Sequence, residues 1–224
     1  MPKLIVPPAS QNTEDYIKGI YKLQKGGQKV TTSALAKHLG IGDGSVTDMV
    51  KKLSQKKLIR YTPYRGVVLT DTGARLALKT VRRHRLWEMF LVQFLGYSWD
   101  EIHDEAERLE HSTSDEMERR LDRALGFPKV DPHGDPIPTV KGEVATIEYL
   151  SLADSDVGTE GSIVRVSDDS PEVLRYMEKL GVVLNKKVKV VDKIQFDGSV
   201  IIKMGSHEIS LSRQMAQGIF VEAR

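Results

Sequence analysis

The chain has 224 residues, of which 29% are charged and 40% are hydrophobic. This length fits two or three compact units, and the composition is that of an ordinary globular chain rather than a disordered one. The lack of cysteine excludes a disulfide framework, an iron–sulfur cluster, a cysteine-type zinc site and thiol catalysis. No apolar run approaches the ~18 residues of a membrane span, and residues 1–8 do not resemble a secretory signal. We therefore expect a cytoplasmic protein with no membrane contact.

Charge is distributed unevenly along the chain. Residues 1–99 carry 17 basic and 6 acidic residues, residues 100–155 carry 6 and 15, and residues 156–224 carry 10 of each. A basic first part followed by an acidic second part is typical of a polyanion-binding head joined to a part that handles cations. The alternative is that charge clusters by chance on solvated faces.

The first 55 residues predict three short helices. Asn12 or Thr13 can cap the first helix, which ends at the glycine pair 26–27. A second helix opens at residues 31–33 and a third begins near Asp43, with a glycine-containing turn between them. Two short helices joined in this way form a helix-turn-helix, whose second helix enters the major groove of DNA.

The next segment predicts the wing of a winged helix. Strand-like runs at residues 58–61 and 67–70 flank a turn at residues 63–66, as in a β-hairpin. Basic side chains on the third helix and the wing are suited to phosphates, and polar ones to base edges. The alternative for the lysines is an ordinary solvated face. The candidate DNA-contacting residues are Ser33, Ser45, Thr47, Asp48, Lys51, Lys52, Arg60 and Arg65.

Two further helices carry side chains that can bind a metal ion. A long helix over residues 72–95, capped by Asp71, places His84 and Glu88 one turn apart. The next helix, about residues 98–111, is still richer in such residues. It carries His103, Glu107, Glu110 and His111. Imidazole and carboxylate ligands without sulfur suit Mn²⁺, Fe²⁺, Co²⁺ or Zn²⁺. Each of these residues alone is more often an ordinary surface or core residue, so the prediction depends on their joint spacing.

Several segments of the chain resemble those of a known family. The segments H-R-L-W-E, H-D-E-A-E-R-L-E-H, S-D-E-M-E-R-R-L and D-P-H-G-D-P-I-P are similar to those of the diphtheria toxin repressor family. The resemblance is close over about residues 12–140 and looser beyond. It implies a metal-dependent transcriptional repressor that binds a double-stranded DNA operator as a homodimer, with no enzymatic activity and no small-molecule substrate.

The resemblance also implies the metal ligands. The primary regulatory site would consist of Asp15, Glu107, Glu110 and His111, and the ancillary site of His84, Glu88 and His103. Iron-type members have methionine at the position of Asp15 and cysteine at that of Glu107, whereas manganese-type members have carboxylates, as here. The resemblance therefore implies Mn²⁺, with Fe²⁺ as the alternative and Zn²⁺ or Co²⁺ as substitutes in vitro.

The chain departs from the family pattern at two places. Lys18 stands where one manganese branch of the family has a second N-terminal glutamate. The third helix opens at residues 42–45 with a sequence that differs from the family pattern. The operator therefore cannot be transferred from a relative.

The C-terminal part predicts a small β domain. A proline-rich loop precedes it, in which we interpret His133 as a turn residue rather than a ligand. Five short strands from about residue 158, interrupted by a helix over 171–180, indicate a small barrel. The resemblance implies an SH3-like, FeoA-type domain that lends a ligand to the ancillary site. Glu172 is the first candidate and Asp169 the second, although capping of the helix explains both residues equally well.

The fold class that we expect is a mostly α-helical winged helix-turn-helix and dimerisation domain, followed by a small all-β SH3-like barrel. The expected boundaries are a DNA-binding domain at 1–75, a metal-binding and dimerisation domain at 76–140, a linker at 141–157 and the SH3-like domain at 158–224. Two other functions stay open from the residues alone. One is a metalloenzyme with an appended DNA-binding head, and the other is a winged-helix adaptor with a structural metal.

Overall fold

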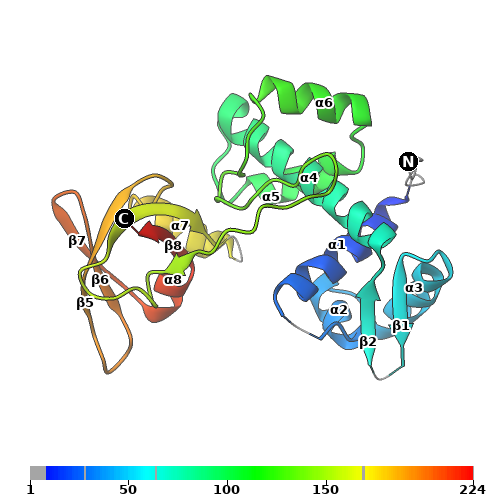
Figure 1. Cartoon of the computed structure of the whole chain (residues 1–224), viewed down its shortest axis with the longest axis horizontal. Helices are drawn as coiled ribbons and strands as arrows, with labels where there is room; N and C mark the ends of the chain where they lie inside the picture. Colours follow the sequence, from blue (N-terminus) through cyan, green and yellow to red (C-terminus); the bar gives the residue numbers. More distant parts are fainter. Residues whose placement is uncertain (1–8, 28, 64, 168–169, 224) are drawn as a thin grey trace. The chain divides into compact units, whose positions relative to one another are not determined.

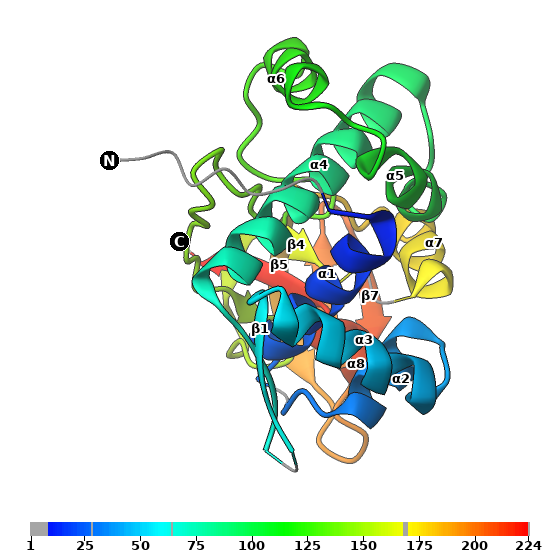
Figure 2. The same ribbon diagram turned by 90° about the vertical axis from the view of Figure 1, so that its right-hand side faces the viewer.

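The computed structural model describes residues 9–27, 29–63, 65–167 and 170–223. The chain divides into two compact units, and two of the boundaries between them fall inside the helices α4 and α5. The first unit takes its described residues from segments 1–84, 109–114 and 138–144, and the second from segments 85–108, 115–137 and 145–224. Figures 1 and 2 show the elements from two sides.

The first unit is a winged helix. Its elements are α1 (Gln11–Lys25), α2 (Thr32–Leu39), α3 (Asp43–Gln55), β1 (Ile59–Thr62), β2 (Gly66–Leu69) and the first part of α4 (Asp71–Leu95). Helix α2 begins where Thr31 Oγ1 accepts a hydrogen bond from the backbone N–H of Ala34 at 3.0 Å, and it ends at Gly40 in the left-handed conformation. The antiparallel strands β1 and β2 form the wing, with Ile59 opposite Leu69.

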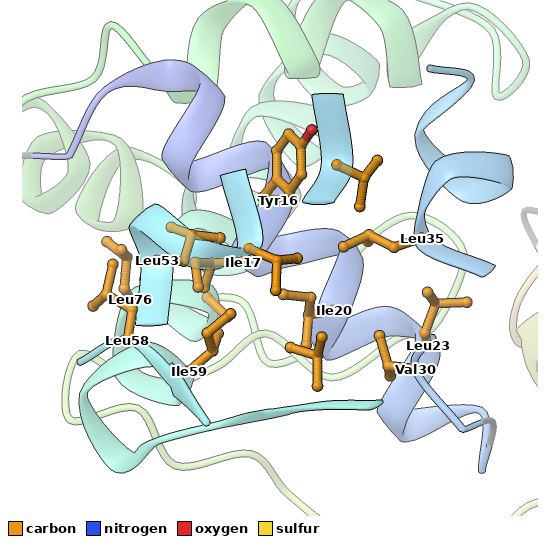
Figure 3. Close-up of a cluster of buried hydrophobic side chains, with 14 of the residues drawn as sticks. Tyr16, Ile17, Ile20, Leu23, Val30, Leu35, Leu53, Leu58, Ile59 and Leu76 are labelled. Carbon is orange, nitrogen blue, oxygen red and sulfur yellow. The ribbon is translucent and has the colours of Figure 1, made fainter. Parts of the chain in front are cut away.

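One hydrophobic core holds this unit together. Apolar side chains of α1, α2, α3, the hairpin and the start of α4 are buried in it, as Figure 3 shows for the labelled residues. Ile17 and Ile20 of α1 and Leu53 of α3 are wholly buried there. Helix α1 is therefore a packed part of the DNA-binding fold, and a constraint on α1 acts on the whole winged helix.

The helix pair between the wing and the C-terminal part is α4 and α5 (Ile102–Glu110), and α6 (Asp115–Ala124) follows it. Helix α4 starts against the hairpin, because Thr70 Oγ1 donates to the carbonyl of Leu58 and accepts from the N–H of Gly73. A Cβ at residue 73 would lie 2.0 Å from the Leu58 oxygen, so only glycine fits there.

The C-terminal part is a six-stranded antiparallel sheet with the order β3-β8-β4-β5-β6-β7. Its strands are β3 (Leu150–Ser151), β4 (Glu160–Val166), β5 (Lys187–Lys193), β6 (Val200–Met204), β7 (His207–Leu211) and β8 (Ile219–Ala223). Two helices, α7 (Pro171–Lys179) and α8 (Arg213–Gln217), accompany the sheet. The side chain of Ser170 accepts from the N–H of Val173, and Pro171 opens α7, as the sequence predicts.

Most elements follow the sequence expectation, and the differences are local. The helix expected from residue 98 begins only at Ile102, because Ser98 Oγ donates to Glu101 Oε2 at 2.7 Å in a turn before it. Helix α6, helix α8 and strand β3 were not expected, and β3 lies inside the range expected as a linker. Among the described residues, no helix is long and apolar enough to span a membrane.

A buried loop at residues 131–135 contacts strand β4 inside the second unit. The carbonyl of His133 accepts from the N–H of Val166 at 2.8 Å, and Arg165 Nε lies 3.2 Å from Asp135 Oδ1. A Cβ on Gly134, whose φ is +92°, would lie 2.0 Å from the carbonyl oxygen of Val164. The loop therefore packs backbone to backbone on the strand.

Candidate metal centres and DNA-binding surface

The structure brings together the four residues expected as the primary site. Asp15 comes from α1, Glu107 and Glu110 lie one turn apart on α5, and His111 follows Glu110 directly. One ligand atom of each residue lies within 4.8 Å of the others. Asp15 and Glu107 are partly exposed, whereas Glu110 is wholly buried.

His111 is oriented by carboxylates at both ring nitrogens. Its Nδ1 lies 2.7 Å from Glu14 Oε2, and its Nε2 lies 2.8 Å from Asp15 Oδ1 and 3.3 Å from Glu110 Oε1. Burial lowers the pKa of His111, but Asp15, Glu14 and Glu110 raise it more, to about 9. The buried Nε2 has no aligned hydrogen bond. A ring nitrogen aimed at two carboxylate oxygens fits a divalent metal ion, with Glu14 holding the other nitrogen.

Glu110 contacts several side chains at once. Its Oε1 accepts from Lys18 Nζ at 2.6 Å, and its Oε2 lies 2.6 Å from His84 Nδ1. The glutamate, the lysine and the histidine are all buried. Neither Glu14 nor Lys18 was expected near a metal ion, because their partners follow 97 and 92 residues later in the sequence.

The residues expected as the ancillary site also come together. Ligand atoms of His84, Glu88 and His103 lie within 4.8 Å of one another. His103 Nδ1 is 3.6 Å from Glu88 Oε1, and its Nε2 is 3.6 Å from Glu107 Oε1. His84 and Glu88 are buried on α4, and His103 is partly exposed. Two imidazoles and a carboxylate are a fitting donor set for a divalent transition metal.

A third group was not predicted. Glu88, Asp131 and His133 are all buried, and their ligand atoms lie within 4.8 Å of one another. His133 does lie in a turn, as expected, but it is only 1% exposed and neither ring nitrogen has a hydrogen-bond partner. Burial and the charge of Glu88 raise the pKa of Asp131 well above its usual range, against the opposing effect of Arg85. A buried imidazole with two unpaired nitrogens beside two carboxylates fits a metal ion better than a purely structural role.

The ligand expected from the C-terminal domain is not in these groups. Glu172 is largely exposed, accepts a hydrogen bond from Ser170 Oγ at 2.8 Å, and belongs to none of the three groups found among the described residues. Its pKa is lowered mainly by that hydrogen bond. Asp169 lies outside the described residues. Glu172 lies in the first turn of α7, next to the capping residue Ser170, and its expected role as a metal ligand stays a prediction.

The expected DNA-contacting side chains lie on the surface of the winged helix. Thr47 is partly exposed, and its hydroxyl donates to the carbonyl of Asp43 at 3.0 Å. Asp48 lies 3.6 Å from Lys51 in an exposed ion pair. The other expected residues are all exposed, namely Ser33, Ser45, Lys52, Arg60 and Arg65. The surface of α3 and the wing is therefore available to a ligand.

Comparisons with known proteins agree with this architecture. Three family models match in succession, described as the N-terminal DNA binding domain of iron dependent repressors over residues 9–67, their metal binding and dimerisation domain over 70–139, and the FeoA domain over 150–223.

Two curated relatives match along nearly their whole length. The iron-dependent repressor IdeR of Mycobacterium leprae is 32% identical, and the match covers 94% of this chain and 96% of that protein. The diphtheria toxin repressor of Corynebacterium diphtheriae is 26% identical with the same coverage.

Solved structures match as well. A manganese-dependent transcriptional repressor in complex with manganese is 40% identical, with a TM-score of 0.87 over 95% of this chain and 100% of that one. ScaR with bound Zn²⁺ is 37% identical, with a TM-score of 0.77 over 94% of this chain and 99% of that one. The matched domains imply operator DNA and a homodimer, which excludes the metalloenzyme alternative. The chain belongs to the family of metal-dependent, DNA-binding transcriptional repressors that includes IdeR and the diphtheria toxin repressor.

Proposed function

We propose that this repressor responds to Mn²⁺, and that the primary group of Asp15, Glu107, Glu110 and His111 is the activating site. The observation that carries the proposal is the donor set, which has three carboxylates and one imidazole in a chain without cysteine. Oxygen-rich sites suit Mn²⁺ better than sites with sulfur ligands do, although intrinsic affinity still rises from Mn²⁺ to the later metals.

Fe²⁺ is the second candidate, because the curated relatives named above are iron-dependent repressors at 32% and 26% identity. The solved structure at 40% identity holds manganese, and two others are called manganese-dependent or a manganese regulator. The donor set and these likenesses together favour manganese.

The coupling of metal to DNA binding runs through α1. Asp15 is one helical turn before Gly19 and belongs to the helix whose Ile17 and Ile20 lie in the winged-helix core. When Asp15 and His111 share a metal ion, the position of α1 is fixed relative to residues 110–111. A metal bound there supplies two positive charges that hold the carboxylates together, and Glu14 keeps the His111 ring in place.

The other two groups share Glu88, so we assign them to an auxiliary metal site. His84 and His103 approach Glu88 in one group, and Asp131 and His133 approach it in the other. The buried, unpaired nitrogens of His133 support a ligand role for that residue. Removing Glu88 therefore disables both groups at once, which helps to separate them from the primary group.

The proposed DNA contacts divide by chemistry. Lys51, Lys52, Arg60 and Arg65 bind phosphates, and Ser45, Thr47 and Asp48 read base edges from α3 in the major groove. Ser33, at the start of α2, binds the sugar–phosphate backbone of the DNA. Exposure of these side chains on the surface of the winged helix supports the assignment.

The deciding experiment is a titration of DNA affinity with Mn²⁺, Fe²⁺, Co²⁺ and Zn²⁺ under anaerobic conditions. The probe is a duplex selected from a random pool by the Mn²⁺-loaded dimer. We expect Mn²⁺ to raise DNA affinity by roughly 5- to 150-fold, the usual range of allosteric coupling. The His111→Ala variant should lose this gain, while the control His207→Ala, which changes an exposed histidine outside the three groups, should keep it.

Two results would contradict the proposal. A full response to Mn²⁺ in His111→Ala would show that the primary group is not the activating site. A response to Fe²⁺ together with no response to saturating Mn²⁺ would assign the repressor to iron.

A further inference from the structure

Lys18 is a buried lysine next to the primary group. It is 5% exposed, it follows Asp15 by three residues on α1, and its Nζ donates to Glu110 Oε1 at 2.6 Å. Glu110 itself is 0% exposed. Lysine is almost never buried unless its charge is paired, and here the ammonium group is paired with a candidate metal ligand.

The oxygen that Lys18 contacts is the one that faces the metal ligands. Glu110 Oε1 lies 3.3 Å from His111 Nε2, the nitrogen that is aimed at Asp15. The other oxygen, Oε2, lies against His84 Nδ1 at 2.6 Å. A metal ion bound by Glu110 and His111 would therefore use the carboxylate oxygen that already carries the ammonium group.

We propose that Lys18 is a built-in competitor for the metal ion, a tethered cation that neutralises Glu110 in the metal-free protein and sets the metal concentration at which the repressor responds. The inference rests on the assignment of the primary group under the proposed function. It concerns affinity, because a cation held beside the site stabilises the metal-free state and opposes entry of a second positive charge.

Two physical effects act in the same direction when the charge of Lys18 is removed. The metal-free protein loses the cation that contacts Oε1 of a wholly buried carboxylate, which raises its free energy. The metal-bound protein loses a repulsion between like charges, which lowers its free energy. Metal affinity should therefore increase, while His84 still holds the second oxygen of Glu110 in place.

The test uses Lys18→Gln, which keeps a hydrogen-bond donor toward Glu110 but has no charge. The matched control is Lys22→Gln, which removes the same charge from an exposed position one turn later on α1. Both are made in the full-length chain with Glu88→Gln, so that the two groups sharing Glu88 do not contribute. Mn²⁺ affinity is measured by calorimetry, and thermal unfolding is followed with and without Mn²⁺.

We expect Lys18→Gln to bind Mn²⁺ about tenfold more tightly or better, in line with the size of effects from residues next to metal ligands. Its melting temperature should fall without metal and recover when Mn²⁺ is added. Lys22→Gln should change Mn²⁺ affinity less than twofold. Lys18→Arg, which keeps the charge, should not gain affinity.

Unchanged or weaker Mn²⁺ binding by Lys18→Gln would overturn the proposal and leave Lys18 with a structural role. If the metal-free variant does not fold, the release of Mn²⁺ from the folded, loaded variant into excess chelator is compared with that from the parent, and faster release by the variant overturns the proposal. His111→Ala in the same background distinguishes the two proposals. Loss of Mn²⁺ binding there confirms the primary group, whatever Lys18→Gln does.

Discussion

The charges around His111 make its proton a competitor of the metal ion. Glu14 lies at Nδ1 and Asp15 at Nε2, and these carboxylates outweigh the effect of burial and bring the pKa of the ring to about 9. Only the neutral ring can bind a metal through Nε2. At pH 7 to 8 the metal-free ring is therefore protonated, and binding must release that proton.

Metal binding to the primary group should consequently depend on pH. Below a pH of about 9, apparent Mn²⁺ affinity should rise with pH by up to about tenfold per unit, and it should level off above that pH. Calorimetry of the Glu88→Gln protein in two buffers of different ionisation enthalpy should show close to one proton released per Mn²⁺ at pH 7.5. A binding enthalpy that does not depend on the buffer would contradict the protonated state of His111.

The ligand types at Asp15 and Glu107 should decide which metal activates the repressor. Replacing Asp15 by Met and Glu107 by Cys introduces two sulfur ligands, which favour softer metals over Mn²⁺. In the anaerobic DNA titration, the double variant should need more Mn²⁺ and less Fe²⁺ than the parent. An unchanged metal profile would place selectivity elsewhere, for instance in the group around Glu88.

At the residue scale, the sequence predicts ligands that share a helix but not the residues that support them. The spacing along α5 predicts Glu107, Glu110 and His111, because helical geometry alone places them on one side. Glu14, Lys18 and His133 escape such reasoning, since each acquires its role from a partner that only the tertiary fold brings near. The one local signal is the acidic pair Glu14–Asp15, which also suits the start of a helix.

At the element scale, the loop at residues 131–135 is held in place by several polar contacts. Asp131 Oδ1 accepts from the backbone N–H groups of His133 and Asp135, and Asp131 Oδ2 lies 3.1 Å from Arg85 Nε on α4. The same loop contacts β4 through the carbonyl of His133. It therefore links α4 to the sheet and holds His133 in the third candidate group.

Gly134 should tolerate no side chain because of this packing. Gly134→Ala places a Cβ against the Val164 carbonyl, whereas the control Gly158→Ala has a similar φ of +93° and open space. Both share the strain of a positive φ, so their difference isolates the clash, which should amount to about 1–3 kcal/mol. Urea unfolding followed through Trp99, in a Trp87→Phe background, measures it, since Trp99 packs against His133. Equal midpoints for the two variants would show that the loop does not pack tightly on β4.

Elements with strong local signals were predictable, and those that depend on the sheet were not. Helices α1 to α4 and the β-hairpin have a clear apolar periodicity, and they form close to where the sequence predicts. The expected caps of α1 and α4 were wrong in detail, because α1 begins at Gln11 after Ser10 and α4 already includes Asp71. Strand β3 has only two residues and exists because it pairs with β8, at Leu150 opposite Val221. Helix α8 has five residues, too few for a periodic pattern.

At the scale of the whole molecule, the repressor acts as a homodimer, and exposed apolar side chains near the end of α4 fit that state. Phe94 and Leu95 are more than half exposed, and Phe94 stacks on Phe90 at a centroid distance of 5.1 Å. Apolar surface of this kind is typical of an interface. In the sequence, Phe94 and Leu95 are separate from the residues expected to contact DNA. The two surfaces can therefore be tested by different substitutions.

Phe94→Asp should therefore weaken the dimer. Loss of one buried phenylalanine per subunit should raise the dissociation constant by on the order of 10- to 100-fold. The control is Phe196→Asp, which changes a still more exposed phenylalanine between β5 and β6. Sedimentation velocity across a concentration series measures both. Dissociation caused by Phe196→Asp but not by Phe94→Asp would move the interface to the C-terminal sheet.

The charge distribution of the molecule predicts how DNA is held. Residues 1–99 have an excess of 11 basic residues, and several of these are exposed on α3 and the wing. Counterion release should make binding strongly dependent on salt, with log affinity falling by roughly 0.9 per neutralised phosphate for each unit of log salt. Arg65→Ala should weaken binding to all sequences alike and reduce the salt slope by about one.

Asp48→Ala should change the preference among DNA sequences rather than the affinity for DNA in general. An acidic side chain is repelled by phosphates, yet it can accept a hydrogen bond from the amino group of cytosine in the major groove. Its removal also releases Lys51, 3.6 Å away, for phosphate contact, so non-specific binding should stay the same or become slightly tighter. Preference among operator variants should change instead, which a competition assay against a panel of single-base substitutions measures. If Arg65→Ala alters sequence preference and Asp48→Ala does not, α3 is not oriented in the groove as proposed. The metal ligands would be unaffected by that result, because none of them lies on α3 or the wing.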